Sequence, residues 1–265
     1  MMSESSQTNL SAIILAAGKG ERMNSDLPKV MHAVAGRPIV QWVVDACRQV
    51  GVQRIIIVVG YGGEVVRAAL ADQPDIVFVE QTKQLGTGHA VDMARACFVD
   101  QPQTTTFVLC GDGPLIRPDT LETLLATHQD GGAAGTLATS VIPDPTGYGR
   151  IVRSPKGAFE RIVEHSDATE SQRTIAEVNP SYYCFNAGAL FDQLSQVSNT
   201  NAGGEYYLTD VFQMMIDAGQ QVGIVDAVPP EDVLSINTPS DLAKVEAFLL
   251  ERTSASKDAV REATG

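Results

Sequence analysis

The 265-residue sequence is short of positive charge: it holds 19 Lys and Arg against 32 Asp and Glu, a formal net charge of −13. That shortage excludes a surface that binds nucleic acid or an anionic membrane, because such a surface needs cations to displace counterions. Small phosphates are not excluded, since a local cluster such as Lys19, Arg22 and Lys29 can be positive inside an acidic protein.

Paired cysteines and long apolar runs are also missing. No C-x-x-C pair exists and no histidine stands at metal-ligand spacing, so we expect four reduced core residues, Cys47, Cys97, Cys110 and Cys184. No apolar run approaches the ~18 residues that a transmembrane helix needs. The first ten residues, MMSESSQTNL, lack the charged and apolar regions of a signal peptide. We therefore expect a cytoplasmic protein with no membrane partner.

A phosphate-binding loop is indicated near the N-terminus, within residues 11–40. The apolar run Ala12–Leu15 is typical of a parallel strand buried on both faces. Gly18 and Gly20 follow, and without a Cβ they let backbone N–H groups approach a phosphate, although a simple tight turn is the alternative. Two cations complete the stretch, Arg22 and Lys29.

Strand and helix patterns alternate through the first half of the chain. Strands are expected at 54–60, 76–81 and 105–110, and helices at 38–50, 64–71, 88–98 and 119–128. This alternation predicts an α/β fold, a doubly wound, mostly parallel sheet with its ligand site at the carboxyl ends of the strands.

The second half of the chain breaks this alternation. Short strands around 150–153 and 159–164 flank a turn and predict a small β-hairpin over the site. Further elements are expected at 182–185, 189–197, 208–218 and 221–228. Thr238 as N-cap and Pro239 at the first helical position predict a last helix to about Glu251. We expect one domain over residues 1–253 and a disordered tail over 254–265.

The string L-A-A-G-x-G-x-R-M followed by P-K-V resembles the signature of the sugar nucleotidyltransferases, most closely the uridylyltransferase domains of bacterial N-acetylglucosamine-1-phosphate uridylyltransferases. The resemblance spans roughly 12–250 and implies a Rossmann-like nucleotidyltransferase fold with a hairpin sugar-binding subregion. It also implies that Arg22 and Lys29 are catalytic cations. The residues that it implies bind the nucleotide here are Leu15, Ala16, Ala17, Gly18 and Gly20.

Two further segments carry the resemblance. In Q-L-G-T-G-H-A (84–90) and the strand end before it, the family match implies that Gln81, Gly86 and Thr87 bind the nucleotide base. The match also implies that Asp112 and Asn237 hold Mg²⁺, a cation that takes oxygen ligands from protein, phosphates and water. A turn or cap role for Asp112, and an N-cap role for Asn237, are the alternatives.

The sugar end of the resemblance is less regular. Gly149, Glu164 and Asn179 match positions that contact the sugar, and Glu164 could otherwise be a surface residue. The chain departs from the family pattern at four positions: Pro180-Ser181 replaces Thr-Gly, Cys110 stands where an aromatic residue is common, and Gly113 replaces an aliphatic residue.

The resemblance implies a Mg²⁺-dependent transfer of a uridylyl group from UTP to a sugar-1-phosphate. The expected acceptor is N-acetylglucosamine-1-phosphate, and the products are UDP-N-acetylglucosamine and pyrophosphate. A different sugar-1-phosphate is the first alternative, and a catalytically silent nucleotide-sugar sensor is the second. The acetyltransferase β-helix of bifunctional family members does not follow in these residues, so we expect no acetyl transfer. The residues define no oligomeric state.

Overall fold

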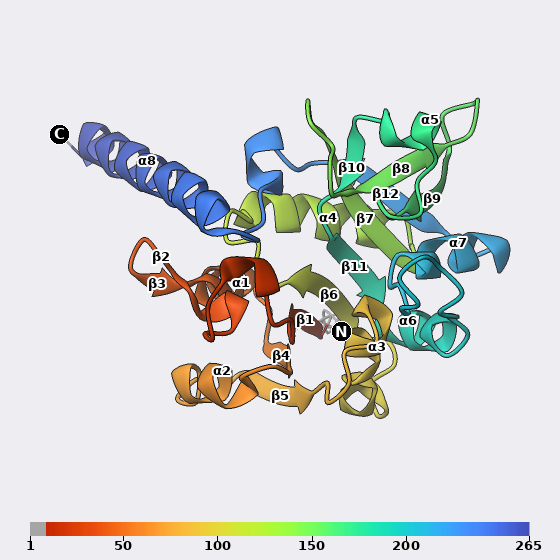
Figure 1. Ribbon diagram of the computed structural model, residues 1–265, viewed down its shortest axis with the longest axis horizontal. Helices are drawn as coiled ribbons and strands as arrows, with labels where there is room; N and C mark the ends of the chain where they lie inside the picture. The colour runs from red at the N-terminus through yellow and green to blue at the C-terminus, as the bar shows by residue number, and fades with distance from the viewer. Residues whose placement is uncertain (1–8, 265) are drawn as a thin grey trace, which may run out of the picture.

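The computed structural model describes residues 9–264, with side chains described for 9–253. Within them the strands form a ten-stranded mixed sheet in the order β5-β4-β1-β6-β11-β7-β10-β8-β9, with β12 also paired to β7, and a two-stranded hairpin (Figure 1). The α/β prediction with a central, mostly parallel sheet is confirmed. The strands of the large sheet are β1 (Leu10–Ala16), β4 (Arg54–Val59), β5 (Ile76–Glu80), β6 (Thr105–Cys110), β7 (Gly135–Val141), β8 (Gly149–Arg153), β9 (Phe159–Val163), β10 (Glu177–Asn179), β11 (Tyr182–Asn186) and β12 (Val222–Asp226).

The parallel half of the sheet is built from the strands that the apolar runs predicted. β1 pairs in parallel with β4 on one side and with β6 on the other, and β5 pairs in parallel with β4. Residues 12–14 and 55–59 are almost fully buried, as expected for strands covered on both faces. All four strands therefore end at one edge of the sheet, and the following loops meet there.

Helices cover both faces of this sheet. One core contains side chains of α1 (Ile39–Gln49), α2 (Gly63–Ala69) and α4 (Pro118–Asp130), packed on Ala12, Ile14 and Ala16 of β1. The opposite core contains side chains of α3 (Thr87–Asp92), α6 (Ala187–Leu194) and α7 (Asp210–Asp217), packed on Ile13. The alternation along β1 thus divides the molecule into the predicted doubly wound layers.

The second half adds antiparallel strands. β11 pairs antiparallel with both β6 and β7, and β10, β8 and β9 continue as an antiparallel extension. β8 and β9 form the predicted hairpin. Sequence patterns missed β7, β10, the β2–β3 hairpin (Ala33–Val34 and Arg37–Pro38) and the short helix α5 (Glu170–Arg173), because such short or fully buried elements show little periodicity.

Two predicted helices differ from the structure by more than a few residues. The expected helix over 88–98 is split into α3 and the 3₁₀ turn η3 (Arg95–Phe98). The last helix, α8 (Pro239–Thr264), runs past the expected end near Glu251, through the segment expected to be a tail, and projects from the body of the molecule (Figure 1). Residues 1–8, where the absence of a signal peptide was inferred, lie outside the described residues. Among the described residues, no helix has both the length and the hydropathy that crossing a membrane requires.

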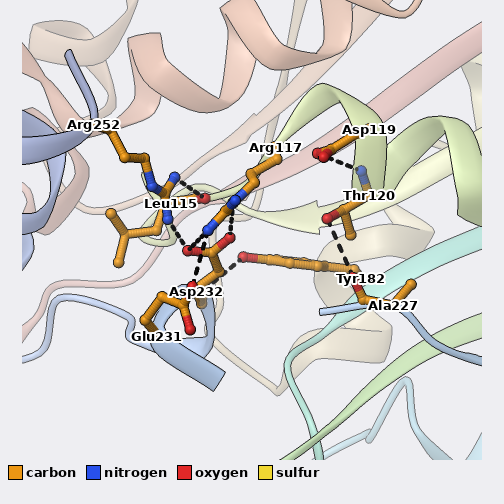
Figure 2. A network of polar contacts seen from close by, with 9 residues as sticks. All are labelled: Leu115, Arg117, Asp119, Thr120, Tyr182, Ala227, Glu231, Asp232 and Arg252. Carbon is orange, nitrogen blue, oxygen red and sulfur yellow. Dashed lines mark hydrogen bonds and ion pairs between the residues drawn. The ribbon is translucent and has the colours of Figure 1, made fainter. Parts of the chain in front are cut away.

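A buried ion network joins the middle of α8 to the turn η4 (Pro230–Val233) and to the residue before α4 (Figure 2). Asp232, 1% exposed, forms ion pairs with Arg117 before α4 and Arg252 on α8. The Arg252 Nη1 donates to the Leu115 carbonyl at 2.9 Å, and the Tyr182 hydroxyl donates to the Asp232 carbonyl at 3.2 Å. The Asp232 carboxylate would be a costly unpaired charge at this depth if the turn η4 moved away from its guanidinium partners. The two ion pairs therefore hold the loop that leads into α8 in place.

The buried His128 predicts an acid-dependent loss of stability. Its side chain, 5% exposed, contacts the Thr136 hydroxyl at 3.0 Å, and burial lowers its pKa from 6.5 to about 4. The folded state therefore favours neutral imidazole. The contribution of neutral His128 to the free energy of unfolding is fully present above pH 6.5 and is lost as the pH falls from 6.5 toward 4. Between pH 7 and pH 5 the free energy of unfolding should fall by about 2 kcal/mol from this group. Urea unfolding at both pH values should show this loss, and His128→Gln should show a smaller one. Equal losses in the two proteins would contradict the prediction.

Candidate active site

The loops at the carboxyl edge of the parallel strands enclose a cavity of about 250 Å³. Its lining includes most of the predicted nucleotide-binding residues together with one predicted cation and one predicted metal ligand: Leu15, Ala16, Ala17, Gly18, Gln81, Gly86, Thr87, Lys29 and Asp112. We call it the nucleotide-side cavity. Its position, at the ends of β1 and β6, is the one that the parallel sheet predicted.

The two glycines of the first loop have different structural roles. A Cβ on Gly18 would meet no protein atom within 4 Å, so its absence leaves room for a ligand beside the backbone. Gly20 has φ +68°, and a Cβ there would lie 2.6 Å from the Lys29 Cβ. Gly20 does not line the nucleotide-side cavity. The absence of a Cβ at Gly20 makes room for Lys29, and a contact between Gly20 and the nucleotide stays a prediction.

The opposite wall of this cavity is held by the chain around Tyr206. Gly86 has φ +110°, and a Cβ there would lie 2.6 Å from the Tyr206 carbonyl oxygen. The Gly88 N–H donates to that carbonyl at 2.7 Å, and the Thr87 hydroxyl accepts from the Leu208 N–H at 3.1 Å. Residues 86–88 are therefore held in place by residues 206–208, which belong to the second half of the chain.

Gln81 is oriented by its neighbours. Its side chain is 5% exposed, and its Nε2 lies 3.1 Å from the Gly86 carbonyl oxygen and 2.9 Å from the His89 Nδ1. No hydrogen bond joins its Oε1 to the part of the chain that the structure describes. The amide oxygen is thus the atom of Gln81 that remains for a ligand donor.

Asp112 and Asn237 meet at two cations between the loops after β6 and before α8. The Lys29 ammonium forms an ion pair with Asp112 Oδ2 and donates to Asn237 Oδ1 at 3.1 Å. Arg22 Nη2 donates to the same Asn237 oxygen at 2.9 Å. The side chains of Lys29 and Asp112 are 16% and 17% exposed, so this cluster lies below the surface. Four residues chosen from the sequence are brought together.

Backbone contacts set the positions of the two oxygen donors. A Cβ on Gly111 would lie 2.9 Å from the Leu15 carbonyl oxygen, so glycine lets the end of β6 approach β1 and carries Asp112 into the site. The Ile236 N–H donates to the Asp112 carbonyl at 3.0 Å, which places Asn237 beside it.

Asn237 is not the helix cap. The Thr238 hydroxyl accepts from the Asp241 N–H at 3.2 Å, and the Asp241 carboxylate accepts from the Thr238 N–H at 2.9 Å. Asn237 Nδ2 donates instead to the Ser235 hydroxyl at 3.0 Å, which turns Oδ1 toward the cations. The expected cap at Thr238 is confirmed.

The donor set fits a hard divalent cation. A carboxylate oxygen and an amide oxygen already converge on one positive group, the Lys29 ammonium. Within the described residues no cluster of three or more His, Cys, Asp or Glu side chains is arranged to hold a metal. Two protein oxygens, completed by phosphates and water, suit Mg²⁺, which seldom occupies an all-protein cage.

A second cavity of about 390 Å³ lies on the other side of Asp112, and we call it the sugar-side cavity. Its lining includes Arg22, Asn237 and all three predicted sugar-binding residues, Gly149, Glu164 and Asn179. A Cβ on Gly149 would lie 3.5 Å from both Asn179 Cβ and Glu164 Oε2, so these three residues are neighbours. Cys110 and Asp112 line both cavities and mark their junction.

Glu164 and Asn179 are both held by protein groups. Glu164 Oε1 accepts from the Thr209 hydroxyl at 2.9 Å, and burial raises the pKa of this carboxyl, with Asp210 adding like charge. Asn179 ends β10 in extended backbone, as expected for a residue before proline. Its Nδ2 donates to the Tyr183 hydroxyl at 2.7 Å, and its Oδ1 accepts from the Ser181 N–H at 3.1 Å.

Sequence patterns missed several residues of the site. Gln84 donates to the Ala17 carbonyl at 2.7 Å and lines the nucleotide-side cavity, as does Glu205. Asp241 accepts from the Asn237 N–H at 3.1 Å, and its place three residues after the cap was the only available signal. Cys110 was expected in the core but lines both cavities. The other contacts join distant segments and leave no local pattern.

Comparisons with known proteins agree with this geometry. Residues 12–202 match the model of the MobA-like NTP transferase domain. The chain is 46% identical over 245 residues to a protein of Brevibacillus brevis named bifunctional protein GlmU. The aligned residues make up 92% of this chain and 52% of that protein. A GlmU of Bacillus cereus strain G9842 is 45% identical over 92% of this chain and 53% of its own length. The chain therefore spans about half the length of the curated relatives it matches.

A solved structure shares the fold. The crystal structure of a UDP-glucose pyrophosphorylase complexed with UDP-glucose superposes with a TM-score of 0.75, covering 91% of this chain and 98% of that chain at 17% identity. The match to the family model covers well over half of the sequence and includes the strand, glycine loop and Asp112 that build the nucleotide-side cavity. This chain therefore belongs to the family of MobA-like NTP transferase domains.

Proposed function

We propose that this chain transfers a uridylyl group from UTP to N-acetylglucosamine-1-phosphate, giving UDP-N-acetylglucosamine and pyrophosphate. The observation that carries the proposal is the meeting of two cavities at Asp112, with Lys29 on one side and Arg22 and Asn237 on the other. Two substrates that react with each other at their phosphates need two adjoining pockets with positive charge at the junction. Residues 1–253 would act as one catalytic unit, in the cytoplasm.

The nucleotide-side cavity supports uracil as the base. The free Oε1 of Gln81 is an acceptor, and the uracil ring offers an N–H donor at N3, which cytosine lacks. The 81–87 wall is held by backbone contacts to Tyr206 and Leu208, so the acceptor stands at a fixed position. A preorganised acceptor favours UTP over CTP, because cytosine would leave it unpaired.

The reaction needs no protein nucleophile. An oxygen of the sugar phosphate attacks the α-phosphorus of UTP in line, the bond to the β-phosphate oxygen breaks, and pyrophosphate leaves with that bond's electron pair. Lys29 and Arg22 stabilise the charge on the transferring group and on the departing pyrophosphate. Asp112 and Asn237 would hold Mg²⁺, which when bound neutralises phosphate charge and orients the phosphates.

The choice of sugar rests on the sugar-side residues and on the relatives. Relatives named bifunctional protein GlmU align along 92% of the chain, and Gly149, Glu164 and Asn179, which match the sugar positions of the resemblance, are neighbours in one cavity. Glu164 retains Oε2 for a sugar hydroxyl, since the contact with Thr209 uses Oε1.

Pyrophosphate release tests the proposal. With UTP, we expect kcat/KM for N-acetylglucosamine-1-phosphate to exceed that for glucose-1-phosphate by about 100-fold or more, because a polar contact to the 2-substituent would be left unpaired. N-acetylgalactosamine-1-phosphate should be a poor substrate as well. A ratio near one would reassign the sugar. Binding of UDP-N-acetylglucosamine without release of pyrophosphate from any sugar phosphate would instead favour a nucleotide-sugar sensor.

A further inference from the structure

Ser181 adopts a backbone conformation that its side chain disfavours. Its φ is +65°, in the left-handed region that L-residues other than Gly, Asn and Asp seldom occupy. Ser181 is one of three non-glycine residues with positive φ among those described, the others being Asn24 and Ala35. Strain of this kind concentrates at binding sites, so its position in the molecule matters.

Ser181 lies in the short connection between β10 and β11 and lines the sugar-side cavity. It does not line the nucleotide-side cavity. The next residue, Tyr182, pairs with Leu109 across the sheet, which sets Ser181 beside Cys110 at the junction of the cavities. Its N–H donates to the Asn179 side chain at 3.1 Å, which ties the strained residue to a predicted sugar-binding residue.

Ser181 lies beside a hydrogen-bonded pair of polar side chains, Asn179 and Tyr183. The Tyr183 hydroxyl, on a side chain that is 3% exposed, accepts from Asn179 Nδ2 at 2.7 Å, so its own proton needs another acceptor. The Ser181 side chain interacts with this hydroxyl and with the Cys110 thiol.

Ser181 lines the sugar-side cavity, so its hydroxyl is available to a ligand there. A hydroxyl has one donor and two acceptor positions. If Tyr183 donates to the Ser181 oxygen, the Ser181 O–H is left to point toward a ligand in the cavity. A glycine at this position would fit the backbone without strain but would supply no donor.

We propose that the Ser181 hydroxyl donates a hydrogen bond to an oxygen of the sugar ring or its substituents and thereby helps to set the affinity for the sugar-1-phosphate. The inference rests on the proposed function and adds a hydroxyl donor to the sugar-side cavity. The strained backbone is kept because it carries this hydroxyl into the cavity.

Two substitutions separate the hydroxyl from the strain. Ser181→Ala removes the hydroxyl and keeps the Cβ, whereas Ser181→Gly removes both. We expect both variants to raise the KM for N-acetylglucosamine-1-phosphate by about 10-fold, the effect of one lost hydrogen bond to a ligand. The KM for UTP and kcat should change less than about three-fold. Ser181→Gly should melt at a temperature no lower than the wild type, because the strain is relieved.

Ala35→Gly is the matched control. Ala35 also has positive φ, at +48°, and lines neither cavity. The Ala35→Gly substitution should relieve backbone strain in the same way and leave every kinetic constant unchanged. Wild-type values for both Ser181 variants, or equal rises in the KM for UTP and for the sugar phosphate, would overturn the proposal. Failure of the proposed function itself would look different, since the wild type would then release no pyrophosphate from UTP with any sugar-1-phosphate.

Discussion

Lys29→Ala should lower kcat by about 100-fold or more, because the ammonium stabilises charge that develops on the phosphates in the transition state. In the structure this group lies between Asp112 and Asn237, 16% exposed, at the junction of the two cavities. Pro28 before it restricts the backbone, and Gly20 packs against its Cβ, so the chain delivers the charge to one place. Initial rates of pyrophosphate release at saturating substrates measure the effect.

Two control variants isolate the charge. Lys29→Met keeps an unbranched stem against Gly20 and should fold like the wild type while losing as much activity as Lys29→Ala. Lys19→Ala removes an ammonium from the same loop, where Lys19 is half exposed and pairs with Glu21 at 3.9 Å, and should keep nearly full activity. A Lys29→Met protein with wild-type kcat would show that Lys29 is not the phosphate clamp.

A binding measurement tests Lys29 without turnover. Because its ammonium stands between the two oxygen donors, it competes with any cation that they would hold. Lys29→Met should therefore bind Mn²⁺, a spectroscopic substitute for Mg²⁺, more tightly than the wild type when no nucleotide is present. Titration calorimetry on both proteins gives the two affinities.

The sequence was informative where local patterns carry the structure. Apolar runs marked β1, β4 and β6, and parallel strands necessarily end at one edge, so Gly18 and Asp112 could be placed together without coordinates. The cap of α8 was readable because Thr238 and Pro239 act within one turn. Gln81, Gly86 and Thr87, which the family resemblance assigned to the nucleotide, line the same cavity.

The sequence was least informative where contacts join distant segments. The close approach of Gly20 to the side chain of Lys29, nine residues later, leaves no local pattern, so the glycine-rich loop was interpreted only as a phosphate-binding turn. Thr209 holds Glu164 across 45 positions, and Tyr206 fixes Gly88 across more than a hundred. The length of α8 was underestimated because a polar composition was interpreted as a frayed end, whereas no glycine or proline interrupts the helix after Pro239.

Asp112→Asn should raise the half-saturating Mg²⁺ concentration by about 10-fold or more and lower kcat at any fixed Mg²⁺ level. The substitution exchanges a charged oxygen donor for a neutral amide, half of which is an N–H₂ group that cannot bind a cation. Its shape is preserved, and the Asp112 backbone contact to Ile236 is untouched, so folding should persist. Asp72→Asn, an equal change of charge on the surface, is the control and should leave the Mg²⁺ curve in place.

The Mg²⁺ titration must also separate two roles of the same carboxylate, since Asp112 both faces the predicted metal position and anchors Lys29. If anchoring were its only role, Asp112→Asn would lower kcat with an unchanged half-saturating concentration, and adding Lys29→Met would cost little more because the lysine is already misplaced. If Asp112 is a ligand, the titration curve shifts, and the double variant shifts back in part, because the competing ammonium is gone. A curve that stays in place in both variants would remove Asp112 from the metal site.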